Sequence, residues 1–536
     1  QAMGGSPFDA PLGRIYRIAL ATREVHPLIR GGSGAGAGTV LKLPIPTSSI
    51  WGAGGNLYLA RGRAIYKLTP SPLPAFTAFD IPDRAAASNT TMSTADAVSV
   101  ISSSIELDAT SSLSSGLAIF IYRNNGIVVS EATVPATAPI RSGRIYASIA
   151  GPANTGLAMV NPNGQPATVN FYFTDTSGNN FGQGSFTIPA GGQIARFLNE
   201  APFRTNSSTP PATVQGTLTF DSSVPVSAIA VRGFTNERAE FLMTTLPVLD
   251  LTTQISANPV LIPHFADGGG WTTSVVLVNP ADQAVSGNIE LRSDDGSSLS
   301  SVPYAISPRS SFVYRTTNSS SQTQTGSIRV LPAASTAAPT GVSIFSFQRG
   351  GVTVTEAGAP TITPKPVFRL YTESTQGFSQ ATSGTVGTGV AIANPSSAAI
   401  TVFFQPTTGE GFPVRTEFPD TVSLTIPARG HRSIFMNELY PILFPLPLRG
   451  VFRIWTDSAE GISLTGVRGR YNERGDFLIT TISPAPESSS ATPVPTYFPH
   501  IVQGGGYTTQ IIIFGNTPGM STSGKVRYFS QSGAPM

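Results

Sequence analysis

The sequence predicts an all-β fold made of tandem immunoglobulin-like β-sandwich modules. From about residue 96 onward, short β-branched or aromatic runs alternate with polar residues, and Gly, Pro, Asn or Ser turns separate them. Turn signals spaced about 8–12 residues apart are typical of antiparallel sandwiches. Long stretches with helical periodicity are absent, and the best helical candidates are single turns near 197–201 and 435–440.

Repeated phrases divide this region into modules. One phrase reads AVRGFTNERAEFLMTT at 230–245 and GVRGRYNERGDFLITT at 466–481. Another reads GVSIFSFQRGGVTVTEAGAP at 341–360, with a looser copy, GLAIFIYRNNGIVVSEATVP, at 116–135. A third reads PHFADGGGWTT at 263–273 and PHIVQGGGYTT at 499–509. Self-similarity at a fixed period indicates a repeat architecture.

The phrases set the module boundaries at 142–251 (module A), 257–363 (module B) and 365–486 (module C). Each module opens with a strand that ends at an Asn-Pro dipeptide, beginning at Asn161, Asn279 and Asn394. Proline has no N–H to donate, so the dipeptide should end each strand. Modules A and C share the Asn-Glu-Arg phrase, whereas module B shares the TVTEAG-like phrase with 96–141, so the two types alternate.

The outer parts of this region differ from whole modules. Residues 71–95 are rich in Pro, then in Ala, Ser and Thr, and are predicted to be a linker. Residues 96–141 resemble the second half of a B-type module, and 492–536 resemble the first half of one. Truncation of the sequence is one explanation. The alternative is strand complementation between chains, in which one chain's tail completes the next chain's head and a head-to-tail fibre forms.

Composition narrows the class of protein. Apolar residues make up 40% of the chain, enough for packed cores, while only 12% are charged and the net charge is +3. No Lys/Arg run is present, so nucleic acid is not an expected partner. The absence of cysteine excludes disulfides and thiolate sites. No apolar run is long enough for a membrane span, and no signal peptide is recognised at Gln1.

The phrases PHFADGGGWTT, GVSIFSFQRGGVTVTEAGAP and RGRYNERGDFLITT resemble β-rich repeats of large exported proteins from soil bacteria such as Acidobacteria. In residues 1–70, the segments GRIYRI, GGNLYLA and AIYKL resemble blades of an NHL-type β-propeller. This resemblance covers about one and a half blades, and a propeller needs at least about four. It implies a partial propeller before the sandwich modules, and export of the protein. It supplies no catalytic residues.

Four residues are candidates for ligand contact. Trp271 and Tyr507 follow the Gly-Gly-Gly turn at equivalent positions, and exposed aromatic rings there could stack on sugars. His264 and His500 are also equivalent, but no metal-binding spacing such as HExxH surrounds them. The competing interpretation is structural: each ring covers its own module's core, and each histidine caps a strand beside a turn with positive φ.

Other polar motifs favour structural roles. Asn236-Glu237-Arg238 and Asn472-Glu473-Arg474 are predicted to be hairpin turns with a local ion pair. The acidic turns at 294–296 and 175–180 lack the spaced oxygen ligands of a calcium site, and the Gly-Gly-Gly loops lack the Lys and helix of a phosphate site. No nucleophile elbow is present. No metal or cofactor is therefore expected.

These features predict a non-catalytic structural or adhesion protein that is secreted or lies on the bacterial cell surface. Neighbouring modules should form a semi-rigid rod. A polysaccharide or a surface protein is the expected partner. The alternatives are a carbohydrate-binding accessory region of a larger exported protein, an extracellular fibre subunit with head-to-tail self-association, and modules accessory to an upstream enzyme.

Overall fold

The computed structural model describes residues 76–536, apart from 92–95, 110, 113, 205–212, 415–420, 441–445 and 489–494, together with the backbone of five strands nearer the N-terminus. The chain forms two compact units, Gln1–Pro74 and Ala75–Met536. Their regular structure is almost entirely antiparallel β, which confirms the predicted all-β fold. The described helices are the short α1 (Met436–Leu439) and η1 (Phe378–Gln380), and neither could cross a membrane.

The N-terminal unit contains a two-stranded sheet of β1 (Ile15–Ala19) and β2 (Glu24–Ile29). A three-stranded sheet follows, formed by β3 (Ser48–Trp51), β4 (Leu57–Arg61) and β5 (Ala64–Leu68). Strands were expected where β1, β4 and β5 lie. Most other residues of 1–70 lie outside the described part of the chain, so the NHL-type propeller stays a prediction.

Module B shows the plan of the larger unit. Its outer sheet has the order β19-β24-β21-β22, and its inner sheet has the order β23-β20-β25-β26. The first two strands, β19 and β20, lie in different sheets, whereas the first two strands of an immunoglobulin domain share one. The strands are β19 (Val260–Asp267), β20 (Trp271–Val278), β21 (Val285–Ser293), β22 (Ser298–Ile306), β23 (Ser311–Arg315), β24 (Gln324–Pro332), β25 (Thr340–Arg349) and β26 (Val352–Pro360).

Modules A and C repeat this order. The outer sheets are β14-β13-β16-β11 in A and β30-β29-β32-β27 in C, and the inner sheets are β15-β12-β16-β17 and β31-β28-β33-β34. The long strand β16 passes through both sheets of A. The strands of A are β11 (Ile140–Ala150), β12 (Ala153–Val160), β13 (Ala167–Asp175), β14 (Asn180–Ile188), β15 (Gln193–Phe197), β16 (Val214–Thr235), β17 (Phe241–Leu246) and β18 (Leu249–Asp250). Those of C are β27 (Val367–Ser374), β28 (Val386–Ala393), β29 (Ile400–Thr408), β30 (Val422–Ile426), β31 (His431–Phe435), β32 (Leu448–Thr456), β33 (Ser463–Tyr471), β34 (Phe477–Ile482) and β35 (Ala485–Pro486).

A fourth module is assembled from segments far apart in the sequence. We call it the composite module. Its outer sheet is β36-β8-β38-β6 and its inner sheet is β10-β9-β37-β7. Strand β37 pairs antiparallel with β9 over nine residues, from Tyr507↔Tyr122 to Gly515↔Ser114. The strands are β6 (Phe76–Ile81), β7 (Ala86–Thr90), β8 (Ser99–Leu107), β9 (Ser114–Asn124), β10 (Ile127–Pro135), β36 (Thr496–Gln503), β37 (Tyr507–Gly515) and β38 (Thr522–Phe529).

The composite module corrects two predictions. The segment 71–95, expected to be a linker, contains β6 and β7, which are edge strands of the two sheets. Sequence alone offered no reason to pair them because their partners, β38 and β37, lie more than four hundred residues away. The segments 96–141 and 492–536, expected to be separate half modules, pair with each other within one chain.

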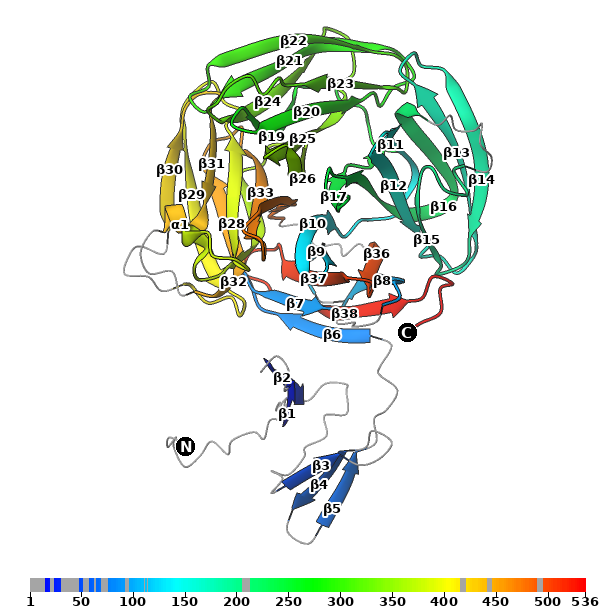
Figure 1. The fold of residues 1–536 in the computed structure, drawn as a ribbon, viewed down its shortest axis with the longest axis vertical. Coiled ribbons are helices and arrows are strands. Elements are labelled where there is room, and N and C mark those ends of the chain that lie inside the picture. The colour runs from blue at the N-terminus through cyan, green and yellow to red at the C-terminus, as the bar shows by residue number, and fades with distance from the viewer. Residues whose placement is uncertain are drawn as a thin grey trace. The chain divides into compact units, whose positions relative to one another are not determined.

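The four modules form a closed ring, as Figure 1 shows, with the inner sheets toward the ring axis. Strands β10, β17, β26 and β34 surround the axis, and each contacts the next in that order. We call these four strands the hub. The expected rod is therefore wrong for this unit. The physical reason is that the apolar cores continue between modules: Leu117 and Ile119 of the composite module belong to the same buried cluster as Leu370 and Phe452 of module C.

The Asn-Pro dipeptides end strands as predicted, but each of these is the second strand of its module and not the opening one, which is β11, β19 or β27. Strands β12, β20 and β28 stop one residue before Asn161, Asn279 and Asn394. Each asparagine side chain is buried and donates a hydrogen bond to the carbonyl four residues later, at 2.7, 2.8 and 2.8 Å respectively. The amide thus satisfies a carbonyl of the turn that follows the strand.

Candidate functional site

The four candidate ligand residues lie at two matching seams of the ring. His264 and Trp271, on β19 and β20, are at the seam between modules B and C, where β19 contacts β28 and β33. His500 and Tyr507, on β36 and β37, are at the seam between the composite module and module A, where β36 contacts β12 and β16. The structure therefore separates them into two pairs.

The Gly-Gly-Gly turns place these residues. Gly268, Gly269 and Gly270 have φ of 80, 60 and 96°, and Gly504, Gly505 and Gly506 have φ of 78, 56 and 86°. These are left-handed values that side chains disfavour. A Cβ at Gly506 would also overlap the Arg123 carbonyl oxygen. The close approach of the turn to β9 thus requires glycine at 506. The conformation of this turn fixes the direction of the aromatic residue that follows, Tyr507.

The aromatic residues pack within their own modules. The Trp271 ring lies 4.8 Å from Phe347 and 6.0 Å from Phe345, centroid to centroid. The Tyr507 ring stacks on Tyr122 at 4.4 Å. Both aromatic residues are partly buried against the seam cores. One face of each ring is thus already occupied, which favours the structural interpretation of Trp271 over sugar stacking.

A chain of polar groups crosses the B–C seam. His264 Nδ1 lies 3.3 Å from His431 Nε2, and His431 Nδ1 lies 2.8 Å from a carboxylate oxygen of Asp294. Thr325 donates its hydroxyl to the same carboxylate at 3.1 Å. Burial, followed by the neighbouring His431, holds the pKa of His264 well below its ordinary value. His264 is therefore neutral at pH 7, and the chain is a hydrogen-bonded link between modules.

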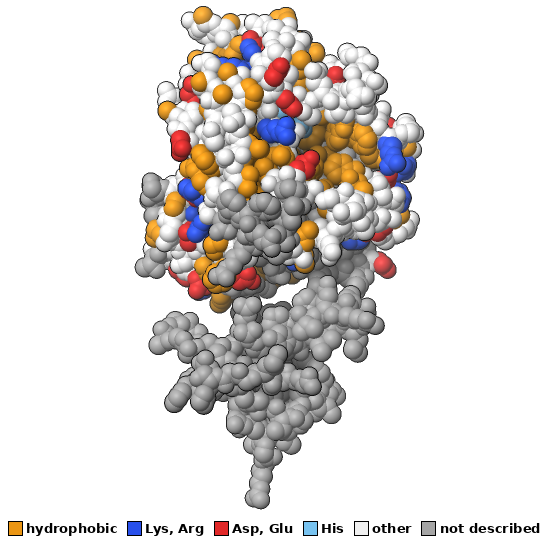
Figure 2. Space-filling view, turned by 90° about the vertical axis from the view of Figure 1, so that its left-hand side faces the viewer, with side chains coloured by type: hydrophobic (Ala, Val, Ile, Leu, Met, Phe, Trp, Pro, Cys, Tyr) orange, Lys and Arg blue, Asp and Glu red, His pale blue; other side chains and the backbone are white. Residues whose placement is uncertain are grey.

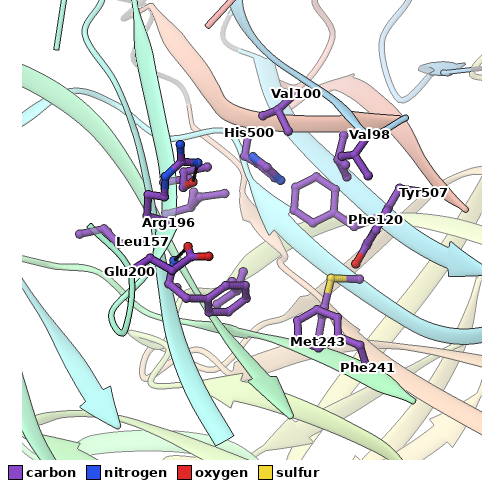
Figure 3. Close-up of a pocket in the computed structure, with 17 residues that line it drawn as sticks. Val98, Val100, Phe120, Leu157, Arg196, Glu200, Phe241, Met243, His500 and Tyr507 are labelled. Atoms are coloured by element: carbon purple, nitrogen blue, oxygen red, sulfur yellow. Dashed lines mark hydrogen bonds between the residues drawn. The ribbon is translucent and has the colours of Figure 1, made fainter. Parts of the chain in front are cut away.

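A pocket of about 350 Å³ lies at the composite–A seam, and Figure 3 shows its lining. Leu157, Phe241 and Met243 of module A face Val100 and Phe120 of the composite module across it. His500 and Tyr507 also line it, while the exposed Arg196 and Glu200 lie at its edge. The His500 ring makes an edge-on contact with Phe120, with centroids 5.5 Å apart.

The polar atom of this pocket has no protein partner. His500 Nδ1 is buried and accepts or donates no hydrogen bond within the described residues. Burial lowers the pKa of His500 to about 4, so the ring is uncharged at pH 7. A buried polar group without a partner is destabilising, commonly by about 1–3 kcal/mol. The pocket can therefore bind an apolar molecule that brings a hydrogen-bonding group to the His500 imidazole.

The Asn-Glu-Arg turns lie at the hub. Glu237 accepts a hydrogen bond from the Thr353 amide at 2.7 Å, and the equivalent Glu473 accepts one from the Val128 amide at 2.7 Å. Asn236 and Asn472 donate to the carbonyls of the same two residues, each at 2.9 Å. Each turn is therefore hydrogen-bonded to the edge strand of a neighbouring module, through both the N–H and the carbonyl of one residue.

The ion pairs of these turns also reach the opposite turn, which corrects the prediction of purely local pairs. Arg238 contacts Asp476 of the opposite turn at 2.8 Å, and Arg474 pairs both with Glu240 of the opposite turn and, at 3.2 Å, with Asp476 of its own. Modules A and C thus meet each other directly at the axis. Sequence spacing suggested pairing within each turn, but the neighbouring carboxylates Glu237 and Glu473 are occupied by backbone amides.

A buried charge network extends the hub. Arg468 is 1% exposed and contacts Glu131 at 3.1 Å and Glu373 at 2.8 Å. Arg470 binds the other oxygen of Glu131 at 2.6 Å. Burial raises the pKa of Glu131, but the guanidinium groups of Arg470 and Arg468 outweigh it and hold that pKa below its ordinary value. The network joins the composite module to module C.

The acidic turns are used within the fold. Asp294 binds His431, and Asp295 accepts the Ser297 amide at 2.9 Å. Hydrogen bonds from Ser293 and Ser297 lower the pKa of Asp295 to about 2. Asp175 accepts the amides of Ser177 and Asn179. Over the described residues, no group of three or more acidic, His or Cys side chains is arranged to hold a metal ion.

Sequence reasoning missed two features. It matched His264 with His500 but did not pair His264 with His431, although His431 occupies the place of Gln193 at the start of the equivalent strand. It also missed the buried arginines, because an Arg-Gly repeat carries no sign of its distant partners. Comparing modules position by position would have found the first feature.

Comparisons with known proteins identify no family. No family model matches the chain, and no curated protein matches it. Among solved structures, an archaeal virus protein with a triple jelly roll fold shares 10% identity, covers 78% of this chain and 92% of its own, and has a TM-score of 0.13. The VP2 subviral particle of infectious bursal disease virus shares 10% identity over 73% of this chain and 80% of its own, with a TM-score of 0.09. Likenesses this weak carry no argument about fold or function.

Proposed function

We propose that this chain is a non-catalytic structural or adhesion protein that acts outside the cell or at its surface, as a rigid ring of sandwich modules. The observation that carries this proposal is the location of the repeated sequence motifs in the structure. The two TVTEAG-like strands and the two Asn-Glu-Arg hairpins form the hub, so the most strongly repeated residues hold modules together. They do not converge on a reacting atom.

The surface also supports a scaffold role. Charged residues make up 12% of the chain, and on the face shown in Figure 2 they are scattered among uncharged side chains. The described part of this face offers neither a basic track for nucleic acid nor an acidic cluster for cations. A polysaccharide or another surface protein is the partner that fits this chemistry. The immunoglobulin-like class of the modules stays a prediction within this proposal.

Binding without turnover tests the proposal. The purified protein should be retained by one or more polysaccharides or cell-wall preparations on a glycan array and in pull-down assays. Parallel samples should release no reducing sugar, acetate or peptide. Turnover that co-purifies with the monodisperse protein would overturn the non-catalytic proposal, and failure to bind any surface material would remove adhesion.

The carbohydrate-binding alternative has less support. Trp271 packs against Phe347 in a tilted contact, and the pocket beside Tyr507 is lined mainly by apolar side chains, which suit the hydroxyls of a sugar poorly. The fibre alternative also has less support, because β36, β37 and β38 pair with strands of their own chain. Sedimentation at micromolar concentration separates these cases: a ring should sediment as a monomer, whereas a fibre subunit should form long assemblies.

A further inference from the structure

We propose that the pocket at the composite–A seam is a binding site for a small, uncharged ring compound that carries one hydrogen-bonding group, which meets the imidazole of His500. The site differs from any adhesive surface on the outside of the ring. It lies between two modules, and its walls come from β8, β9, β36 and β37 on one side and from β12, β15, β16 and β17 on the other.

The size and lining of the pocket define the ligand. A volume of about 350 Å³ lies at the small end of ligand sites. At about 30 Å³ for each water-sized group, it holds roughly a dozen such groups. Its walls are mostly aliphatic and aromatic (Val98, Val100, Phe120, Leu157, Ile229, Val231, Phe241, Met243 and Val502). A flat or compact ring system of one or two rings fits these dimensions.

The B–C seam provides an internal comparison, because the same positions are filled differently there. Phe120 and His500 match Phe345 and His264, and both pairs make edge-on contacts, at 5.5 and 5.1 Å. At the B–C seam the nitrogen of His264 that corresponds to His500 Nδ1 is bonded to His431. At the composite–A seam, Gln193 stands where His431 stands, and both atoms of its buried side-chain amide also have no protein partner.

The rest of the polar chain is replaced as well. Strand pairing aligns Val502↔Val100 with Ala266↔Thr325, so Val100 takes the place of the threonine that binds Asp294. The backbone N–H of Gln193 donates to the backbone carbonyl of Gln531, just as the backbone N–H of His431 donates to that of Asp294. Gln531 therefore takes the place of the aspartate. The composite–A seam has thus exchanged a closed polar network for an apolar pocket with a free nitrogen.

The charges around the pocket exclude other ligands. Arg196 and Glu200 are exposed at its edge and of opposite sign, and Glu200 already accepts the Phe197 amide at 2.8 Å. The low pKa of His500 leaves the ring neutral at pH 7. A carboxylate or ammonium ion held between the apolar walls would lose its hydration while Arg196 and Glu200 stay at the edge, and a sugar would bury several hydroxyls without partners.

Three probes of one shape test the proposal on the unaltered protein: 2-naphthol, naphthalene and 2-naphthoate, followed by fluorescence or calorimetry at pH 7. We expect saturable 1:1 binding of 2-naphthol, about 2- to 12-fold weaker binding of naphthalene, since a net hydrogen bond is worth about 0.5–1.5 kcal/mol, and no binding of 2-naphthoate. No saturable binding of 2-naphthol or naphthalene would overturn the proposal. So would equal or tighter binding of 2-naphthoate.

Variants assign the binding to this pocket. Replacement His500→Phe should abolish the preference for 2-naphthol over naphthalene, and Ala195→Phe should block both by filling the pocket. The matched control His264→Phe, at the B–C seam, should leave both affinities unchanged. Binding that survives both pocket substitutions, or that is lost only in His264→Phe, contradicts the assignment. Circular dichroism confirms that each variant is folded, and the three-probe ranking remains decisive if one is not.

Discussion

At the scale of single residues, buried charges are the most informative feature of this protein. Arg468 and Glu131 are almost completely buried, and each is held by two partners of opposite charge. Replacing a whole buried pair by apolar residues can be nearly neutral, but removing one partner leaves the other charge without compensation. Residues in this network should therefore respond very differently from the exposed pair Arg123–Glu473.

We expect Arg468→Met to lower the free energy of unfolding by about 3–5 kcal/mol, because Glu131 and Glu373 would both lose a buried cation. Urea denaturation followed by circular dichroism measures the change. The control Arg123→Ala should cost no more than about 1 kcal/mol, since its ion pair is largely exposed. Equal losses in the two variants would show that the buried network does not stabilise the ring.

The histidines predict how stability depends on pH. Burial lowers the folded-state pKa of His500 to about 4, while the unfolded chain binds the proton near 6.5. As the pH falls from about 6.5 toward 4, the unfolded state takes up the proton first, so the free energy of unfolding should fall over this window. The His264 pKa is also well lowered, so it should contribute in the same direction.

Chemical denaturation at pH 7, 6 and 5 measures this dependence, and His500→Phe should flatten it. Titration of Glu131 does not contribute to this pH dependence. Its pKa is lowered in the folded state, so it affects the free energy of unfolding only below the ordinary glutamate pKa near 4.5. Unchanged stability from pH 7 to 5 in the unaltered protein would contradict the prediction.

At the scale of elements, the turns decide where the side chains lie. The three-glycine turns hold residues with positive φ close to a neighbouring strand, whereas other positive-φ glycines, such as Gly519, have open space where a Cβ would stand. The two kinds of glycine therefore separate the effect of backbone conformation from the effect of close packing.

We expect Gly519→Ala to cost about 1–2 kcal/mol, from its left-handed conformation alone. Gly506→Ala should cost clearly more, because the added Cβ would overlap the Arg123 carbonyl oxygen and would displace β37 from β9. Thermal unfolding of the two variants compares them directly. Equal shifts in Tm would mean that the turn moves freely away from β9.

At the scale of the whole molecule, the ring depends on segments from both ends of the 76–536 unit. Strands β36, β37 and β38 supply inner and outer strands of the composite module, and its core is continuous with that of module A through Ala158 and Met243. Modules of a rod contact only their sequence neighbours, whereas here every module contacts at least two others through the hub, and the composite module and module C close the ring. Cooperativity should therefore extend around the ring.

We expect residues 76–536 to unfold in a single transition, with a calorimetric enthalpy equal to the van't Hoff enthalpy. Removal of 492–536 should expose the partner edges of β8 and β9 and cause loss of that transition, together with aggregation. Differential scanning calorimetry and size-exclusion chromatography measure both effects. Separate transitions for modules A, B and C would show that the modules fold independently.

The sequence by itself determined the all-β class, the strand ends at Asn161, Asn279 and Asn394, and the equivalence of His264 with His500. These are local properties, set by alternation, turn residues and repetition. The tertiary structure decided the ring, the composite module, the ion pairs between opposite turns and the pocket at the composite–A seam. Each of these depends on which distant surfaces meet. Strand pairing has almost the same local pattern whether the partner lies ten or four hundred residues away, so only the folded chain selects between them.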